Sequence, residues 1–118
     1  MVKVLINGCN GRMGKVLVNE ISRFEDLLLV AGFDINDSGL NTFPVYSDIN
    51  DIKEDIDVIV DFSVPAASLN ILKYAVKTKT AMVIATTGFN EDELKEVEKA
   101  MDLEKIPTEE RERYLTKL

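Results

Sequence analysis

Short apolar runs alternate with stretches of helical periodicity along this chain. Four runs predict β-strands, at Val2–Ile6, Leu27–Phe33, Asp57–Phe62 and Ala81–Thr86. The last two are continuous apolar runs, which are typical of strands buried on both faces of a parallel sheet. A shorter extended piece is expected at Phe43–Tyr46.

The segments between the strands predict helices. The first is expected from about Gly11 to Arg23, where a spacing of i, i+4, i+8 and i+11 gives it an apolar face. The members of that face are Met13, Leu17, Ile21 and Phe24. A weak helix is expected at Asp48–Lys53, and a last helix at Thr108–Lys117.

Two further helices have recognisable start signals. Pro65 suits the first turn of a helix, because proline lacks an N–H group that this turn would leave unpaired. The apolar positions of its helix are Leu69, Leu72 and Val76. Asn90 and Glu93 have the spacing of a capping box at the start of the next helix. That helix carries Leu94, Val97 and Met101.

This alternation of strands and helices predicts an α/β fold, a Rossmann-like parallel sheet with helices on both faces. The length of 118 residues suits a single domain with its own core. No apolar run approaches the roughly 18 residues of a membrane span, and the N-terminus lacks the charged-then-apolar layout of a signal peptide. We therefore expect a cytoplasmic protein.

The charge and the rare residue types narrow the partners and the chemistry. The chain has 21 acidic and 14 basic residues and a net charge of −7, which disfavours nucleic acid and anionic membrane surfaces as partners. Its single cysteine excludes an intramolecular disulfide framework. The lack of histidine excludes histidine metal ligands and histidine acid–base catalysis, and no metal site is expected.

The beginning of the chain predicts a dinucleotide site. After the first strand come Gly8, Gly11 and Gly14, then a helix, a second strand and Asp34, twenty residues past Gly14. The N–H groups that open such a helix bind a pyrophosphate, and an acid at the end of the second strand binds ribose hydroxyls. Gly8 then permits the turn, Gly11 lets phosphate approach the backbone, and Gly14 lets helix and strand pack closely. The alternative is a structural turn without a ligand.

Other residues of the turn have two interpretations each. Arg12 and Lys15 are positive charges that could face a phosphate, although Lys15 is equally explained as a solvated helix residue. Cys9 stands where the G-x-G-x-x-G pattern has a glycine. We interpret it as a small residue that fits the turn, in preference to a reactive thiol.

Two more loops are expected at the carboxyl ends of strands, where open α/β sheets bind their ligands. They are Asp61–Pro65 and Ala85–Phe89. Ser63, Thr86 and Thr87 offer hydroxyls to a nicotinamide ribose or its carboxamide. The alternative for Ser63 and Thr87 is that they only cap the helices that follow.

Together these segments resemble the nucleotide-binding domain of 4-hydroxy-tetrahydrodipicolinate reductase, long called dihydrodipicolinate reductase. The matching motifs are G-C-N-G-R-M-G at Gly8–Gly14, D-F-S-V-P at Asp61–Pro65 and A-T-T-G-F at Ala85–Phe89. The resemblance covers about residues 1–101. Enzymes of this family pass a hydride from NADH or NADPH to the cyclic imine of the bacterial and plant lysine pathway.

The resemblance implies which residues bind the cofactor. The glycine turn would enclose the pyrophosphate, Asp34 would bind the adenine ribose, and the Ala85 loop would flank the nicotinamide. The full set is Gly8, Cys9, Asn10, Gly11, Arg12, Met13, Asp34, Ser63, Ala85, Thr86 and Thr87. The family usually has glycine at position 85. Ile35 stands where members that use NADPH often have arginine, so NAD(H) is the favoured cofactor and NADP(H) the second candidate.

The chain departs from the family after Met101. Relatives continue into another strand and a substrate domain with a histidine pair and a lysine. We expect a dinucleotide-binding domain at 1–101, a helical tail at 102–118 unlike the family, and no substrate domain. The expected function is NAD(P)(H) binding that is catalytically incomplete alone, with no catalytic residue assigned and with a homo-oligomer or a partner domain as the expected assembly. The alternatives are a non-enzymatic interaction or regulatory module, and a dehydrogenase subunit completed by a partner chain.

Overall fold

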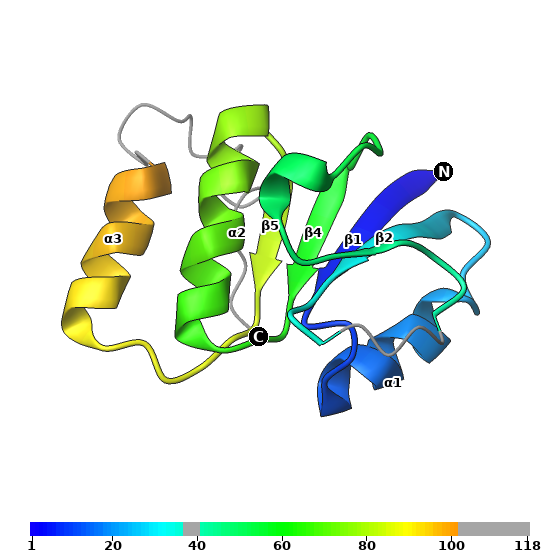
Figure 1. Ribbon diagram of the computed structural model, residues 1–118, viewed down its shortest axis with the longest axis horizontal. Coiled ribbons are helices and arrows are strands. Elements are labelled where there is room, and N and C mark those ends of the chain that lie inside the picture. The colour runs from blue at the N-terminus through cyan, green and yellow to red at the C-terminus, as the bar shows by residue number, and fades with distance from the viewer. Residues whose placement is uncertain (37–40, 102–118) are drawn as a thin grey trace.

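The computed structural model describes residues 1–36 and 41–101. The helix expected at Thr108–Lys117 and the tail expected at 102–118 lie outside the described residues. Within them, five parallel strands form one sheet in the order β3-β2-β1-β4-β5 (Figure 1). The strands are β1 (Val2–Asn7), β2 (Leu27–Phe33), β3 (Val45–Tyr46), β4 (Val58–Asp61) and β5 (Ala81–Ile84). The α/β prediction and the predicted strands are confirmed, although β4 and β5 are shorter than their apolar runs.

Helices cover both faces of the sheet (Figure 1). They are α1 (Arg12–Ile21), α2 (Pro65–Thr78) and α3 (Glu91–Met101), and a short 3-10 helix, Ile49–Asp51, lies where the weak helix was expected. Helix α1 contacts β1 and β2, whereas α2 contacts β5, β1 and α3. None of the helices in the described ranges has the length and apolar character that crossing a membrane requires.

The central strand β1 supplies both layers of the core. Val4 and Ile6 pack with Ile21 of α1 on one face of the sheet, and Leu5 packs with Ile71 of α2 on the other. All five side chains are buried. Burying a large aliphatic side chain contributes about 1.5–3 kcal/mol, so the period-two alternation of β1 fixes the strand between its two helical layers.

The predicted apolar face of α1 is wrong at both ends. Met13 is 50% exposed, and Phe24, which follows the end of the helix, is 54% exposed. The face toward the sheet is formed by Gly14, Leu17, Val18 and Ile21. Gly14 packs so tightly against the glycine turn that it sets the rotation of the helix. A similar shift occurs in α2, where Ala75 is buried and Val76 is 42% exposed.

The predicted start signals of α2 and α3 are confirmed. Pro65 is the first residue of α2. Before α3, the N–H of Asn90 donates to Oε1 of Glu93 at 3.0 Å, and the N–H of Glu93 donates to Oδ1 of Asn90 at 2.8 Å. This reciprocal pair is a capping box, which supplies two acceptors that the helix itself lacks at its start.

The strand order places a crevice between β1 and β4. The chain runs from β1 outward to β2 and β3, and then returns to the other side of β1 to form β4 and β5. Connections from β1 and β4 therefore leave the sheet in opposite directions. In open α/β sheets a ligand binds at the carboxyl ends of the strands where this reversal occurs.

Candidate functional site

The glycine turn after β1 forms one wall of the crevice. Gly8 has φ of +84°, and a Cβ added there would lie 2.2 Å from the carbonyl oxygen of Phe62. A Cβ on Gly14 would lie 1.9 Å from the carbonyl oxygen of Gly8. Both glycines are therefore required by the fold. Gly8 is required for its backbone conformation, and Gly14 for close packing, as predicted. The segment that packs against Gly14 is the glycine turn itself.

Gly11 differs from the other two glycines of the turn. Its φ is −76°, which any residue can adopt, and a Cβ there would meet only the carbonyl oxygen of Gly8, at 3.3 Å. The residue is exposed. A shift of a few tenths of an ångström would relieve this contact, so the fold of the described chain restricts this position far less than it restricts Gly8 and Gly14. A ligand lying against the backbone would give a further reason for glycine.

Helix α1 directs its N-terminus toward the same region. Gly11 is its N-cap residue and has no side chain to cap the helix, and the first turn contains no acidic residue. The first N–H groups of a helix have no intrahelical acceptor, and the helix dipole favours an anion there. Arg12 and Lys15 are exposed in the first turn and add positive charge. This end of the helix suits a phosphate.

Cys9 turns away from the crevice. It is fully buried in the layer between α1 and the sheet, and its Sγ lies 2.5 Å from where a Cβ on Gly32 would be. The interpretation of Cys9 as a small residue that fits the turn is confirmed. The Cys9 side chain is therefore not available to a ligand in the crevice.

The acid at the end of β2 faces the glycine turn. One carboxylate oxygen of Asp34 accepts the N–H of Asn10 at 3.0 Å, and the other accepts the N–H of Asn36 at 2.9 Å. The amide of Asn10 also donates to the carbonyl oxygen of Asn36. These bonds orient the Asp34 carboxylate before any ligand arrives. The neighbouring Ile35 is 83% exposed.

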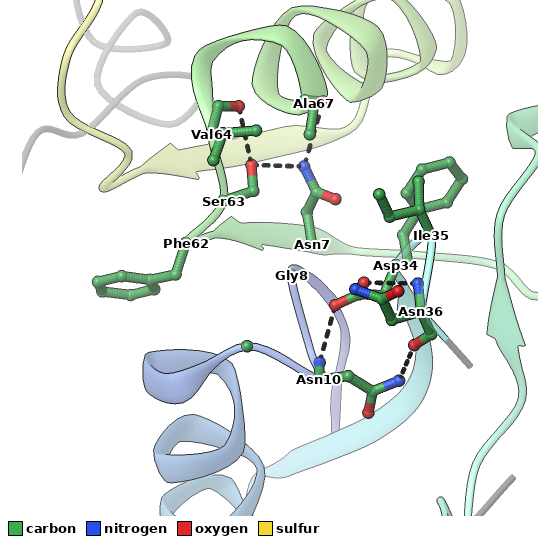
Figure 2. A pocket seen from close by; sticks show the side chains of 12 residues that line it. Asn7, Gly8, Asn10, Asp34, Ile35, Asn36, Phe62, Ser63, Val64 and Ala67 are labelled. Atoms are coloured by element: carbon green, nitrogen blue, oxygen red, sulfur yellow. Dashed lines mark hydrogen bonds between the residues drawn. The ribbon is translucent and has the colours of Figure 1, made fainter. Parts of the chain in front are cut away.

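A cavity of about 350 Å³ lies between the glycine turn, the end of β2 and the start of α2. Figure 2 shows Asn10, Asp34 and Asn36 joined on one side and Asn7 joined to Ser63 on the other, with Gly8 between the two groups. Two exposed apolar side chains, Ile35 and Val64, also line the cavity. The cavity thus combines polar groups with apolar surface, as small-molecule sites do.

The loop after β4 does not cap α2 through Ser63. The N-cap residue is Val64, and no side-chain hydrogen bond is made from it. Instead the Ser63 hydroxyl donates to Oδ1 of Asp61 at 2.6 Å. Ser63 lines the cavity, as predicted for a ligand contact. The capping alternative for Ser63 is wrong.

The environment of Asp61 differs from the one that the sequence predicts. Asp61 is the first residue of the loop Asp61–Pro65, which the sequence places among the ligand-binding loops. Its side chain is instead fully buried and bonded to its protein neighbours. Burial raises the pKa of the Asp61 carboxyl, while hydrogen bonds from Ser63, Ser68, Thr86 and Asn7 act in the opposite direction. Asp61 supports the cavity wall and does not line it.

The loop after β5 lies next to the loop after β4. The Thr86 hydroxyl accepts the N–H of Ser63 at 2.9 Å and donates to Asp61 at 3.0 Å. Thr87 is exposed, and Asn90 provides the cap of α3 that was an alternative role for Thr87. Ala85, Thr86 and Thr87 are not part of the cavity lining. They lie outside this cavity, so their predicted contact with a ligand stays a prediction.

Sequence analysis assigned no ligand contact to seven of the residues that line the cavity, which include Phe33, Ile35, Phe62 and Ala67. The other three are Asn7, Asn36 and Val64. A signal existed for Asn7, which is the one polar residue that ends the apolar run of β1. No comparable signal marked Asn36 or Val64, because their roles depend on how the loops approach one another.

The strand order, the glycine turn and the helix N-terminus define the class of this protein as a Rossmann-type α/β domain. The model of the family "Dihydrodipicolinate reductase, N-terminus" matches residues 2–108. The chain belongs to this family, which confirms the resemblance found in its motifs. It is homologous to the N-terminal, NAD(P)-binding domain of dihydrodipicolinate reductase.

Individual relatives agree with the family assignment. The chain is 48% identical over 100 residues to a 4-hydroxy-tetrahydrodipicolinate reductase of Caldanaerobacter subterraneus subsp. tengcongensis, a match that covers 85% of this chain and 39% of the relative. Among solved structures, dipicolinate-bound dihydrodipicolinate reductase from Paenisporosarcina sp. TG-14 superimposes with a TM-score of 0.70 at 26% identity. That match covers 90% of this chain and 45% of the solved one.

The fold also occurs in dehydrogenases of other families. Scyllo-inositol dehydrogenase from Lactobacillus casei, solved with bound cofactor NAD(H) and scyllo-inositol, has a TM-score of 0.77 at 16% identity and covers 99% of this chain and 36% of its own. At that identity the likeness concerns the fold alone. The chain spans about two fifths of the length of the curated relatives it matches, and these relatives are named 4-hydroxy-tetrahydrodipicolinate reductase.

Proposed function

We propose that the chain binds a pyridine dinucleotide in the cavity between β1 and β4, with NAD(H) favoured over NADP(H). The observation that carries this proposal is Gly11. The fold restricts this position far less than it restricts Gly8 and Gly14, yet a side chain would cover the open N-terminus of α1, where a phosphate would lie.

The lining of the cavity supports one orientation of the cofactor. The pyrophosphate lies on the main chain from Gly8 to Met13, and the adenine ribose bonds the preoriented carboxylate of Asp34. The adenine lies between the exposed side chains of Ile35 and Val64. The nicotinamide half then extends past Ser63 toward the loop that contains Ala85, Thr86 and Thr87.

The preference for NAD(H) follows from charge at the ribose position. An extra 2′-phosphate would lie next to the Asp34 carboxylate, and the residue that follows is the uncharged Ile35. Like charges in contact repel, so NADPH should bind more weakly than NADH. Replacement of Asp34 by alanine should narrow this gap, and the ratio of the two dissociation constants is the quantity to compare.

The relatives named 4-hydroxy-tetrahydrodipicolinate reductase suggest the reaction that this site serves. We infer that the chain forms the cofactor half of such a reduction, in which the bound dinucleotide supplies a hydride. Among the described residues, the polar side chains that we place near the nicotinamide end are Asp61, Ser63 and Thr87, and none of them is a cation that could hold a dicarboxylate. The 118-residue chain alone should therefore bind the cofactor without reducing substrate, and cofactor-dependent substrate consumption by the purified chain would contradict this.

Calorimetric titration with NADH tests the binding proposal. Gly11→Val should abolish detectable binding while the circular dichroism spectrum stays native, because the added side chain occupies the space of the phosphate. Asn70→Val, which places the same side chain on an exposed position of α2, is the matched control and should bind like the unmodified chain. Equal NADH affinity in folded Gly11→Val protein would remove the basis of the proposal.

A further inference from the structure

A buried carboxylate lies behind the wall of the cavity. Asp61 is fully buried at the carboxyl end of β4, and within residues 1–36 and 41–101 its hydrogen-bond partners are all neutral side chains. A buried charge is costly unless hydrogen bonds compensate it.

Four different segments donate to this carboxylate. Oδ1 accepts the amide of Asn7 at the end of β1, at 3.0 Å, and the hydroxyl of Ser63 after β4, at 2.6 Å. Oδ2 accepts the hydroxyl of Thr86 after β5, at 3.0 Å, and that of Ser68 in α2. Asp61 thus joins every element that borders the crevice on the β4 side.

The hydroxyl protons of this cluster can be assigned by counting. Each hydroxyl has one proton, and the contact of Ser63 with Asp61 is shorter than its contacts with the other possible acceptors, which are Ser68 at 3.2 Å, the carbonyl oxygen of Val64 at 3.3 Å and Thr86 at 3.5 Å. Thr86 must accept at its other contact, because its partner there is the N–H of Ser63. All three protons therefore point at the carboxylate, which is acceptor-only when ionised.

This assignment fixes what Ser63 offers to the cavity. Its proton is held by Asp61, and the amide of Asn7 approaches one lone pair at the longer distance of 3.3 Å. Ser63 lines the cavity, and one lone pair of its hydroxyl oxygen remains for a ligand. A ligand group that bonds Ser63 must then be a donor, such as an amide N–H or a ribose hydroxyl.

We propose that Asp61 is a positioning residue of the cofactor site, which holds the proton of Ser63 and thereby makes Ser63 an obligatory hydrogen-bond acceptor toward a donor group of the dinucleotide. The proposal rests on the proposed function, because it needs a dinucleotide in the cavity. Beyond the proposed function, it states which partner donates and which accepts in one contact between protein and ligand. That direction is set by Asp61, which the ligand does not contact.

The test measures binding of NADH and of ADP-ribose by calorimetry to the 118-residue chain and its variants. Asp61→Asn keeps the shape of the side chain but turns one acceptor into a donor, so at least one hydroxyl must rotate. NADH affinity should fall about tenfold, the usual worth of one hydrogen bond. Ser63→Ala should cause a similar loss, and the double variant should bind no more weakly than either single variant, because both changes remove one contact.

Ser68→Ala is the matched control. Ser68 bonds the same carboxylate but lies outside the cavity lining, so this variant should lower the melting temperature and leave NADH affinity within about twofold. If Asp61 served only the stability of the fold, Asp61→Asn and Ser68→Ala would behave alike. Comparison of the two ligands locates the donor: a loss with NADH only places it in the nicotinamide nucleoside, and a loss with both places it in the part shared with ADP-ribose.

The outcomes separate the two proposals. If the unmodified chain binds NADH and the Asp61→Asn variant binds it with equal affinity, the role of Asp61 is overturned and the proposed function stands. Failure of the unmodified chain to bind either ligand would overturn both. Should Asp61→Asn not fold, Ser63→Ala decides alone, because unchanged affinity there would show that the contact does not exist.

Discussion

At the scale of single residues, three glycines in one turn have three different physical reasons. Gly8 is needed for a positive φ, and Gly14 for a contact that leaves no space for a methyl group. Gly11 is needed for neither. Sequence spacing alone predicted the set, but only the structure separates the two glycines that the fold requires from the one that a ligand explains.

This separation predicts opposite effects for two equal substitutions. Gly14→Ala should lower the free energy of unfolding by at least about 2 kcal/mol, because its methyl group would lie 1.9 Å from a carbonyl oxygen. Gly11→Ala should cost less than about 1 kcal/mol, the usual effect of alanine at an N-cap. Urea denaturation of both variants measures the difference, and similar losses would mean that Gly11 too is a structural glycine.

Asp61 predicts an unusual dependence of stability on pH. Burial raises its folded-state pKa above the ordinary value of 3.8, so below that pH the carboxyl is protonated in both the folded and the unfolded chain. As the pH rises through the raised value, the folded chain must ionise a buried group. The contribution of Asp61 to the free energy of unfolding is therefore present in acid and lost as the pH rises.

Comparison with Asp61→Asn isolates this effect, because the other carboxylates contribute equally to both proteins. The free energy of unfolding of the unmodified chain minus that of the variant should decrease as the pH rises above 3.8, and become constant once the pH exceeds the raised pKa of the folded chain. Denaturation at a series of pH values measures it. A difference that grows with pH would indicate a lowered pKa and contradict the burial argument.

At the scale of elements, strands were predicted better than helix faces. The apolar run marked β2 at its observed bounds, although Leu28 is 43% exposed and only Ala31–Phe33 are buried. The buried face of α1 differs from the predicted one, because the close contact of Gly14 with the glycine turn sets the rotation of the helix and leaves Met13 exposed. Periodicity gives the existence of a helix, while its rotation depends on a contact made with another segment.

The capping box of α3 gives the prediction at this scale. Asn90→Ala removes the acceptor for the N–H of Glu93 and should lower the free energy of unfolding by about 1 kcal/mol. Asn70→Ala, on the exposed face of α2, is the control and should change stability by less than about 0.5 kcal/mol. Equal effects of the two changes would show that the box adds nothing beyond helix propensity.

At the scale of the whole molecule, the site is a product of strand order. The switch between β1 and β4 brings the glycine turn, Asp34 and Ser63 to one cavity although they are far apart in the sequence. The motifs made the glycine turn and Asp34 predictable, because both belong to one βαβ unit. Burial of Asp61 could not be predicted, since it depends on donors from four separate segments.

The central claim is that a pyridine dinucleotide occupies this cavity, and NMR mapping of amide resonances during titration with NADH tests it most directly. The resonances of Gly8, Asn10, Gly11 and Ser63 should shift together and saturate, because these residues line the cavity. Those of Lys3 and Leu28, at the opposite ends of their strands, should not move. Shifts confined to that opposite end, or no saturable shifts at all, would contradict the account.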